Sequence, residues 1–228
     1  MATPQLTVKK DFIELEFIGK NAQTGEVFDT NILEEAKKIN PKIIEVKPLV
    51  VCIGEGFVVK GLDDFLEGKE IGKKYNLKLD AEQAFGKRNP QMVRLIPLKV
   101  FMAQKIYPQP GMTLALDNSL VKVVSVSGGR VMVDFNNPLA GKDIEYDFSI
   151  KSIVSNNKEK IEAFLKFLLG QSFEFDIDEE KKKVIFKDVR LTPIIQALAP
   201  KFKEVLGFDV EIFAKKEEKK AEDVKEIK

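Results

Sequence analysis

Apolar and polar positions alternate along the first third of the chain with the two-residue period of short β-strands. In the segment 12–17, the side chains at 13, 15 and 17 are apolar and those at 14 and 16 are glutamates, which is typical of a strand with one buried face. Residues 49–53 form a β-branched apolar run that is typical of a buried strand, and 75–79 alternate again. A short helix is predicted over 62–66, ending at Gly68.

The pattern changes in the middle of the chain. A stretch crowded with apolar side chains is interrupted by Pro90 and Pro97, and proline lacks the amide that a helix interior needs, so one long helix is not expected. Two valine-rich runs, 121–126 and 131–135, flank Ser127-Gly128-Gly129. Glycine accepts a positive φ, so this spacing predicts a tight hairpin within a small β-rich unit.

The last third of the chain follows a helical period instead. Asn156 with Glu159 resembles a capping box, apolar side chains recur at i, i+3, i+4 and i+7 from Ile161, and Gly170 ends the helix. Two strand-like runs, a second helix and a last short strand follow. The predicted order is therefore helix, strand, strand, helix, strand, with a Lys- and Glu-rich tail from Lys215 whose composition is typical of a disordered segment.

Composition narrows the classes of function. Apolar residues make up 44% and charged residues 32%, which suits a folded core with a solvated surface. The 37 basic and 36 acidic residues leave a formal net charge of +1, so overall charge gives no reason to expect a nucleic-acid partner. The chain has no His, which excludes Ser-His and Cys-His nucleophile pairs and removes the commonest metal ligand, and Cys52 is its single cysteine.

Targeting and membrane signals are not apparent in the sequence. No apolar run approaches the ~18 residues that a membrane span needs, and no long apolar run follows a basic region at the start of the chain. We therefore expect a cytoplasmic protein without a membrane partner.

Three partial motifs do not complete a ligand site. Gly54, Gly56 and Gly61 lack the spacing and the crossover helix of a dinucleotide loop, and the segment 68–73 falls one residue short of a P-loop. The acidic cluster 176–180 lacks the glycine and terminal glutamate of an EF-hand. We expect no cofactor and no metal.

Five blocks carry a more specific signal when they are read in order. They are FIELEFIGK, TGEVFDT, VVCIGEGFVVKGLDDFLEGKEIGKKYNLKL, AEQAFG and, after an intervening segment, LAGKDIEYDFSI. In this order they resemble the FK506-binding (FKBP) type of peptidyl-prolyl cis-trans isomerase, and the intervening segment resembles the insert-in-flap domain of its SlyD-like branch. The resemblance covers about residues 6–154, and long archaeal members look similar in carrying a C-terminal extension.

The resemblance, together with the pattern of the last third of the chain, predicts an α+β fold in three parts. An antiparallel half-barrel sheet wrapped on a short helix would be formed by residues 1–88 and 139–154. A small β-rich domain, residues 89–138, would be inserted in it, and an α/β domain of order αββαβ, residues 155–228, would follow.

The resemblance also implies an apolar pocket for a proline ring. Carried over by position, the catalytic residues would be Asp29, Val59, Leu62, Phe85 and Tyr146, and the remaining substrate-binding residues of the pocket would be Phe17, Leu49 and Val58. The amide of Val59 would bind the substrate carbonyl, Leu62 would be the floor, and Asp29 would orient the peptide from the edge. Without the resemblance, the apolar positions would be interpreted as ordinary core.

Such a pocket suits a reaction that needs no nucleophile. Rotation about an X-Pro bond faces a barrier of ~18–20 kcal/mol from amide resonance, but no bond is made or broken. An apolar site disfavours the planar, charge-separated amide relative to the twisted one, which is differential binding of the transition state.

The sequence departs from the family pattern at three of these positions. Phe17 and Phe85 stand where the family often has Tyr, and Leu62 stands where it often has Trp. Two hydroxyls that usually hold Asp29 and a ligand carbonyl are thereby lost. A holding chaperone with little or no isomerase activity therefore remains the alternative.

The expected partners are unfolded or proline-containing polypeptides. Leu95, Ile96, Val100 and Phe101 in the insert would hold such clients near the pocket and raise their effective concentration; the alternative is that they fill the insert's own core. The apolar helices of the C-terminal part predict a homodimer, and a structural assembly role is a third hypothesis.

Overall fold

The computed structural model describes residues 5–116 and 119–212 of the 228-residue chain. Contacts between residues divide the chain into two units, and the boundary along the sequence lies between Ile153 and Val154. The predicted disordered tail from Lys215 lies outside the described residues.

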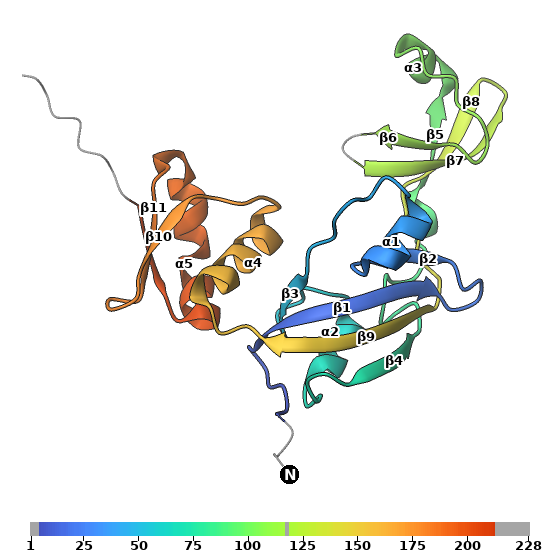
Figure 1. Cartoon of the computed structure of the whole chain (residues 1–228). Helices are drawn as coiled ribbons and strands as arrows, with labels where there is room; N and C mark the ends of the chain where they lie inside the picture. Colours follow the sequence, from blue (N-terminus) through green and yellow to red (C-terminus); the bar gives the residue numbers. More distant parts are fainter. Residues whose placement is uncertain (1–4, 117–118, 213–228) are drawn as a thin grey trace, which may run out of the picture. The chain divides into compact units, whose positions relative to one another are not determined.

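The first unit contains a five-stranded antiparallel sheet in the order β2-β1-β9-β4, with β3 also paired to β1 (Figure 1). Its elements are β1 (Phe12–Asn21), β2 (Val27–Thr30), α1 (Leu33–Ile39), β3 (Leu49–Cys52), α2 (Lys60–Leu66), β4 (Lys74–Leu79) and β9 (Ile144–Ile153). β9 pairs along almost the whole of β1. A long segment separates β4 from β9 in the sequence, but the two strands are neighbours in the sheet, which stays continuous.

β1 is the strand on which this sheet is built. Ile13, Leu15 and Phe17 are buried on one face, and the intervening glutamates remain half-exposed, which confirms the predicted two-residue period. β9 pairs with one edge of β1, while β3 and then β2 share the other edge. The strand therefore holds segments together that lie far apart in the sequence.

α2 covers the buried face of the sheet. Leu62 and Leu66 lie four residues apart on the same side of the helix, and both are buried in the cluster that contains the apolar side chains of β1 and β9. A Cβ at Gly61 would lie 2.5 Å from Cδ2 of Leu79. Glycine therefore allows the start of α2 to approach β4 closely.

A second sheet forms in the segment between β4 and β9, which we call the insert. It contains η1 (Pro90–Met92), β5 (Val93–Pro97), α3 (Leu98–Ala103), β6 (Thr113–Leu116), β7 (Ser119–Ser127) and β8 (Arg130–Asp134). The strands are antiparallel in the order β5-β8-β7-β6, around a core of Phe101 and four valines of β7 and β8. Gly128 and Gly129 both have positive φ and join β7 to β8, which confirms the predicted hairpin.

The second unit combines two helices with a three-stranded sheet. Its elements are α4 (Asn157–Leu169), β10 (Phe175–Asp178), β11 (Lys183–Phe186), η2 (Val189–Leu191), α5 (Thr192–Leu206) and β12 (Asp209–Ile212). The strand order is β10-β11-β12, and β12 runs parallel to β11. The ring of Phe202 on α5 lies 5.2 Å from that of Phe164 and 6.2 Å from that of Phe186, so aromatic contacts join both helices to the sheet.

The ends of α4 are set by local chemistry. The side chain of Asn156 accepts hydrogen bonds from the amides of Lys158 and Glu159, and Gly170 closes the helix with φ 72°. Both ends were predicted, because caps of this kind depend on neighbouring residues.

The described part of the chain has neither a membrane-spanning helix nor a cluster of metal ligands. In residues 5–116 and 119–212, no helix is both long and apolar enough to cross a membrane. Over the same residues, no group of three His, Cys, Asp or Glu side chains has the geometry to hold a metal ion.

Candidate functional site

Seven apolar residues predicted from distant parts of the chain belong to one hydrophobic cluster, which we call the aromatic cluster. Three of its members are buried and lie on β1, α2 and β9, namely Phe17, Leu62 and Tyr146. Four others pack against the same hydrophobic core but stay partly exposed, namely Leu49, Val58, Val59 and Phe85. The cluster is therefore continuous with the core on one side and presents apolar surface to solvent on the other.

Phe28 on β2 joins the aromatic members of this cluster. Its ring centroid lies 5.9 Å from that of Phe85 and 6.0 Å from that of Tyr146, and Tyr146 lies 6.1 Å from Phe17. All three pairs meet edge to face, the arrangement that the aromatic quadrupole favours. Sequence reasoning missed Phe28; the only signal was its position directly before Asp29.

Gly19 on β1 leaves the space that these rings occupy. A Cβ at this position would lie 2.6 Å from Cζ of Phe28 and 3.0 Å from Cε1 of Tyr146. The absence of a side chain at Gly19 thus allows the two rings to meet over the strand.

Asp29 is exposed on β2, directly opposite Gly19 in the strand register. Burial raises the pKa of Tyr146 to about 12, and the negative charge of Asp29 contributes to the same shift. The Tyr146 hydroxyl therefore keeps its proton at neutral pH and remains a hydrogen-bond donor beside a carboxylate.

The amide of Val59 is available to a ligand. Val59 is the residue before α2, and its carbonyl accepts hydrogen bonds from the amides of Leu62 and Asp63. Its own N–H donates to none of the residues that the structure describes. A donor of this kind beside apolar side chains can orient a carbonyl group without a charged residue.

The turn that carries Val58 and Val59 is held by a buried carboxylate. Asp63 on α2 is 7% exposed, and its two oxygens accept hydrogen bonds of 2.9 Å from the amides of Gly54 and Gly56. Both glycines have positive φ, a conformation that glycine adopts without steric cost. Asp63 is thus a positioning residue that sequence reasoning missed.

Two polar side chains fasten the end of β2 to β1. Asn31 donates to the carbonyl of Leu15 at 2.6 Å and accepts from the amide of Phe17 at 2.8 Å, and the hydroxyl of Thr30 donates to the carbonyl of Phe17 at 2.7 Å. These bonds give hydrogen-bond partners to backbone groups of β1 that lie between the residues paired with β3 and those paired with β2. Neither was predicted, because their roles depend on partners thirteen or more residues away.

Two family models match the chain over the parts just described. The model of the FKBP-type peptidyl-prolyl cis-trans isomerase matches residues 3–100, and that of the FKBP26 IF domain matches residues 94–139. The chain therefore contains an FKBP-type peptidyl-prolyl cis-trans isomerase domain together with an FKBP26-type IF domain.

Curated relatives carry names of the same family. The short-type peptidyl-prolyl cis-trans isomerase of Methanocaldococcus jannaschii is 28% identical over 150 residues, which cover 65% of this chain and 94% of that protein. The FKBP-type isomerase SlyD of Aeromonas hydrophila is 30% identical over 139 residues, and that of Escherichia coli K12 is 29% identical over 118 residues. Each match spans about 60% of the length of the SlyD protein. The two matches cover 60% and 50% of this chain, respectively.

Two hollows are found in the described part of the chain. One, of about 580 Å³, is lined by the insert and its connecting segments, and the other, of about 630 Å³, lies against α5 and β12. Neither is lined by the predicted catalytic residues. The proline pocket therefore stays a prediction that is supported by the shared cluster and not by a measured cavity.

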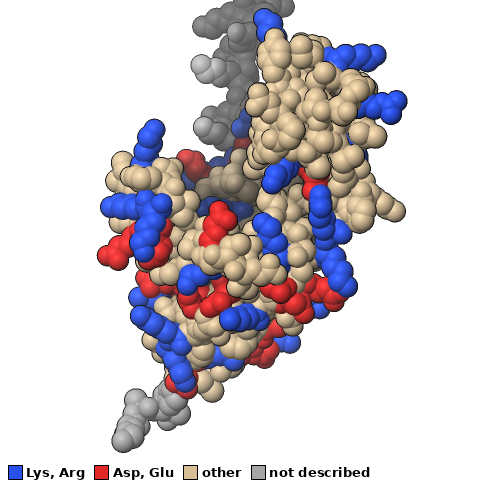
Figure 2. All heavy atoms as spheres, turned by 90° about the vertical axis from the view of Figure 1, so that its right-hand side faces the viewer, with Lys and Arg blue, Asp and Glu red and all other residues tan. Residues whose placement is uncertain are grey.

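The predicted client surface of the insert is divided between core and solvent. Leu95 is 58% and Val100 is 43% exposed, whereas Ile96 is half-buried against the insert core. Phe101 is only 1% exposed, so the expectation that it contacts a client is corrected: its ring fills the centre of the small unit, which has few other large side chains. Figure 2 shows a broad uncharged face on the insert, with Lys and Arg at its margin.

Replacement of Asp63 by Ala should loosen the turn before α2. We expect the free energy of unfolding to fall by about 1–3 kcal/mol, because two amides lose their acceptor, and isomerase activity to fall with it. Urea unfolding followed by circular dichroism measures the first effect. Asp63→Asn keeps one acceptor oxygen and should lie between.

The exposed neighbour Asp64 supplies the matched control. Asp64→Ala should change the free energy of unfolding by no more than about 0.5 kcal/mol, as is usual for surface positions. If the two alanine variants were equally stable and equally active, Asp63 would have no positioning role.

Proposed function

We propose that the chain catalyses cis-trans rotation of X-Pro bonds at the aromatic cluster and that its insert holds unfolded segments for that site. The observation that carries the proposal is that seven apolar residues from separate segments share one hydrophobic core, four of them partly exposed, near Asp29 and a Val59 amide that donates to none of the described residues. The match of residues 3–100 to the FKBP-type isomerase model supports the same reaction.

The chemistry follows from the polarity of the amide. The planar X-Pro amide is stabilised by charge separation, which water solvates better than apolar side chains do. Half-exposed rings and aliphatic chains around the proline therefore weaken the planar form relative to the twisted form. No group of the site has to accept or donate a proton.

The polar groups at the edge of the cluster would orient the peptide. The Val59 N–H would bind the carbonyl of the residue that precedes the proline or of a close neighbour, and α2 keeps that amide fixed. The Tyr146 hydroxyl and the Asp29 carboxylate would take up further backbone groups of the peptide. These contacts compensate for the hydroxyls that Phe17 and Phe85 do not supply.

Replacement of Val59 by Pro should remove the donor with little change to the fold. The φ of Val59 is −57°, which matches proline, and its N–H has no acceptor among the described residues. We expect kcat/KM for a short X-Pro peptide to fall about fivefold or more, because the substrate carbonyl is left without its donor, which costs about 1–3 kcal/mol. Protease-coupled or NMR exchange assays measure it.

Val59→Ala is the matched control, because it shortens the side chain and keeps the N–H. It should lose less than about threefold if the amide is the binding group. Equal losses in both variants would assign the effect to the side chain instead. A wild-type rate equal to the rate in buffer would reject the isomerase function itself.

The distribution of exposed apolar residues favours the insert as the holding surface. Among the described residues, eight of the fourteen large apolar side chains that are exposed lie in residues 89–138. Since this segment is less than a quarter of the chain, apolar surface is concentrated there. A holding chaperone without catalysis is the second candidate function, and this same observation supports it.

A double variant tests the holding surface. Leu95→Gln with Val100→Gln should weaken suppression of client aggregation about fivefold, because each removes roughly one exposed apolar contact. Light scattering of a denatured client diluted into buffer gives the measurement. The control is Lys99→Gln, which changes the neighbour of Val100 on α3 and should have little effect. Suppression of aggregation by a chain that does not accelerate peptide isomerisation would favour the second candidate.

We propose further that the second unit forms a homodimer. β12 pairs with β11 on one edge and with no described strand on the other, and Ile194 on α5 is 44% exposed. An unpaired strand edge and exposed apolar side chains each favour association. Sedimentation should give the mass of a dimer, Ile194→Asp should shift it to the monomer, and Lys166→Asp on α4 should not. A monomeric wild-type chain would contradict this proposal.

A cytoplasmic location fits the chemistry of the single thiol. Cys52 is fully buried, and burial raises its pKa to about 12, so it stays a protonated thiol. The chain thus depends on no oxidised cysteine.

A further inference from the structure

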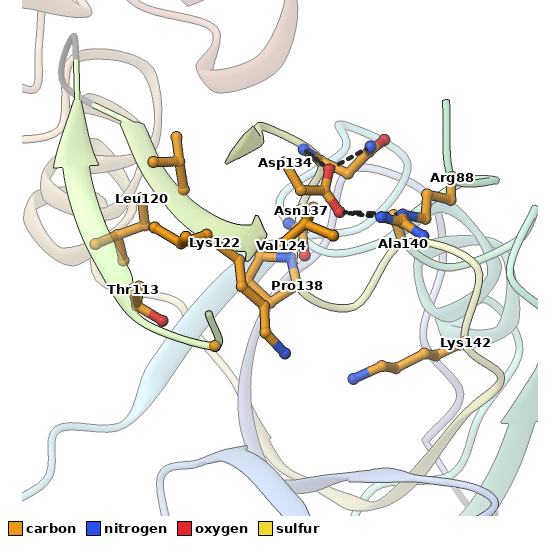
Figure 3. A pocket seen from close by; sticks show the side chains of 14 residues that line it. Arg88, Thr113, Leu120, Lys122, Val124, Asp134, Asn137, Pro138, Ala140 and Lys142 are labelled. Carbon is orange, nitrogen blue, oxygen red and sulfur yellow. Dashed lines mark hydrogen bonds and ion pairs between the residues drawn. The ribbon is translucent and has the colours of Figure 1, made fainter. Parts of the chain in front are cut away.

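The hollow beside the insert, which we call the hinge hollow, combines apolar walls with lysine side chains. It has a volume of about 580 Å³ and lies between strands β6 and β7 and the two segments that connect the insert to β4 and β9 (Figure 3). A volume of this size accommodates several side chains of a ligand. Its lining contains three cations, Arg88, Lys122 and Lys142, and one carboxylate, Asp134.

The single carboxylate is already paired. Nε and Nη2 of Arg88 donate to one oxygen of Asp134 at 3.0 and 2.6 Å, and the other oxygen accepts from the backbone and side chain of Asn136. The charges of Arg88 and Asp134 therefore offset each other. The two lysines are the uncompensated charges of the hinge hollow.

Lys122 and Lys142 approach the same space from opposite walls. Lys122 lies on β7 and Lys142 on the segment that leads into β9, and Figure 3 shows their side chains directed towards each other across the hollow. Neither makes an ion pair with an acidic residue of the described chain. Like charges that converge without a counter-charge repel each other, and an anion between them removes that cost.

The rest of the lining selects the kind of anion. Leu120 is 65% and Val124 is 41% exposed, and both face the hollow together with Pro138. A glutamate or aspartate in an apolar chain segment matches this arrangement, because its neighbours can pack on the apolar wall while its carboxylate reaches the lysines.

The hinge hollow is tied closely to the aromatic cluster. The amide of Gly141 donates to the carbonyl of Gly86 at 2.8 Å. Gly141 precedes Lys142 and Gly86 follows Phe85, so this bond links the wall of the hinge hollow to the aromatic cluster. Asn136 holds the two connecting segments together, with hydrogen bonds of 2.8 and 3.0 Å to the backbone of Asn89. A chain segment held in the hollow would therefore lie near the isomerase site.

We propose that the hinge hollow binds an acidic side chain of the client and gives the protein a preference for clients with Asp or Glu near the proline. This inference rests on the proposed function, since it names a property of the polypeptides on which that function acts. Lys122 and Lys142 supply the charge, and Leu120, Val124 and Pro138 supply the apolar contact.

Two fluorescent peptides that differ only at two positions near a Leu-Pro bond test the proposal. One carries Glu and the other Gln at those positions, and both are bound to the full chain at about 0.1 M salt, where the screening length is about 10 Å. We expect the Glu peptide to bind about fivefold more tightly, the size of two exposed ion pairs. The preference should shrink as salt is added.

Charge variants of the full chain separate a specific site from overall attraction. Lys122→Gln with Lys142→Gln should abolish the preference. Lys99→Gln with Lys105→Gln removes the same charge from the insert outside the hollow and should preserve it. Lys122→Glu with Lys142→Glu should reverse the preference towards a peptide with Lys at the same positions, a gain that a misfolded variant could not produce.

The outcomes distinguish this inference from the isomerase function. If the chain isomerises both peptides and binds them equally, the inference is overturned and the isomerase function stands. If it prefers the Glu peptide but accelerates neither, the isomerase function fails and the hollow keeps its assignment. Displacement of the Glu peptide by inorganic phosphate, at constant ionic strength, would assign the hollow to a small anion and overturn the proposal.

Discussion

The pairing of β1 on both of its edges is the constraint on which the rest of the first unit depends. β9 occupies one edge, and β3 and β2 share the other, so one strand brings Leu49, Phe17 and Tyr146 within the same cluster. α2 then closes the buried face. Because the insert leaves and returns between β4 and β9, it can be carried without any break in this sheet.

The same constraint explains why the site is built from ordinary apolar residues. The cluster is buried on its inner side and partly exposed on its outer side. The residues that hold it in place must therefore leave the outer side uncovered. Asp63 and Asn31 provide such supports by binding backbone groups from behind or beside the cluster, and Gly19 provides one by leaving space. The surface left open is apolar, and the Val59 amide on it donates to no residue in the described part of the chain.

In the insert, by contrast, many large apolar side chains stay exposed to solvent. It is small, and its core is Phe101 with a few aliphatic side chains, so Leu95, Val100 and Leu120 remain in solvent. Exposed apolar surface carries an aggregation risk, but it suits a segment that binds other chains transiently. Lysines in the hinge hollow would add selectivity to a surface that is otherwise indifferent to sequence.

The sequence by itself determined the features that depend on near neighbours. The Asn156 cap, the Gly170 end of α4, the Gly128-Gly129 hairpin and the alternation in β1 all follow from residues a few positions apart, and the family pattern identified the residues of the aromatic cluster. Only the tertiary structure decided which apolar side chains of the insert are buried, that Phe28 joins the rings, and that Asp63 and Asn31 hold backbone groups. The reason is physical: burial and hydrogen-bond partnership depend on what long-range packing brings near a residue, and Phe101 and Val100 look alike until the insert has folded around one of them.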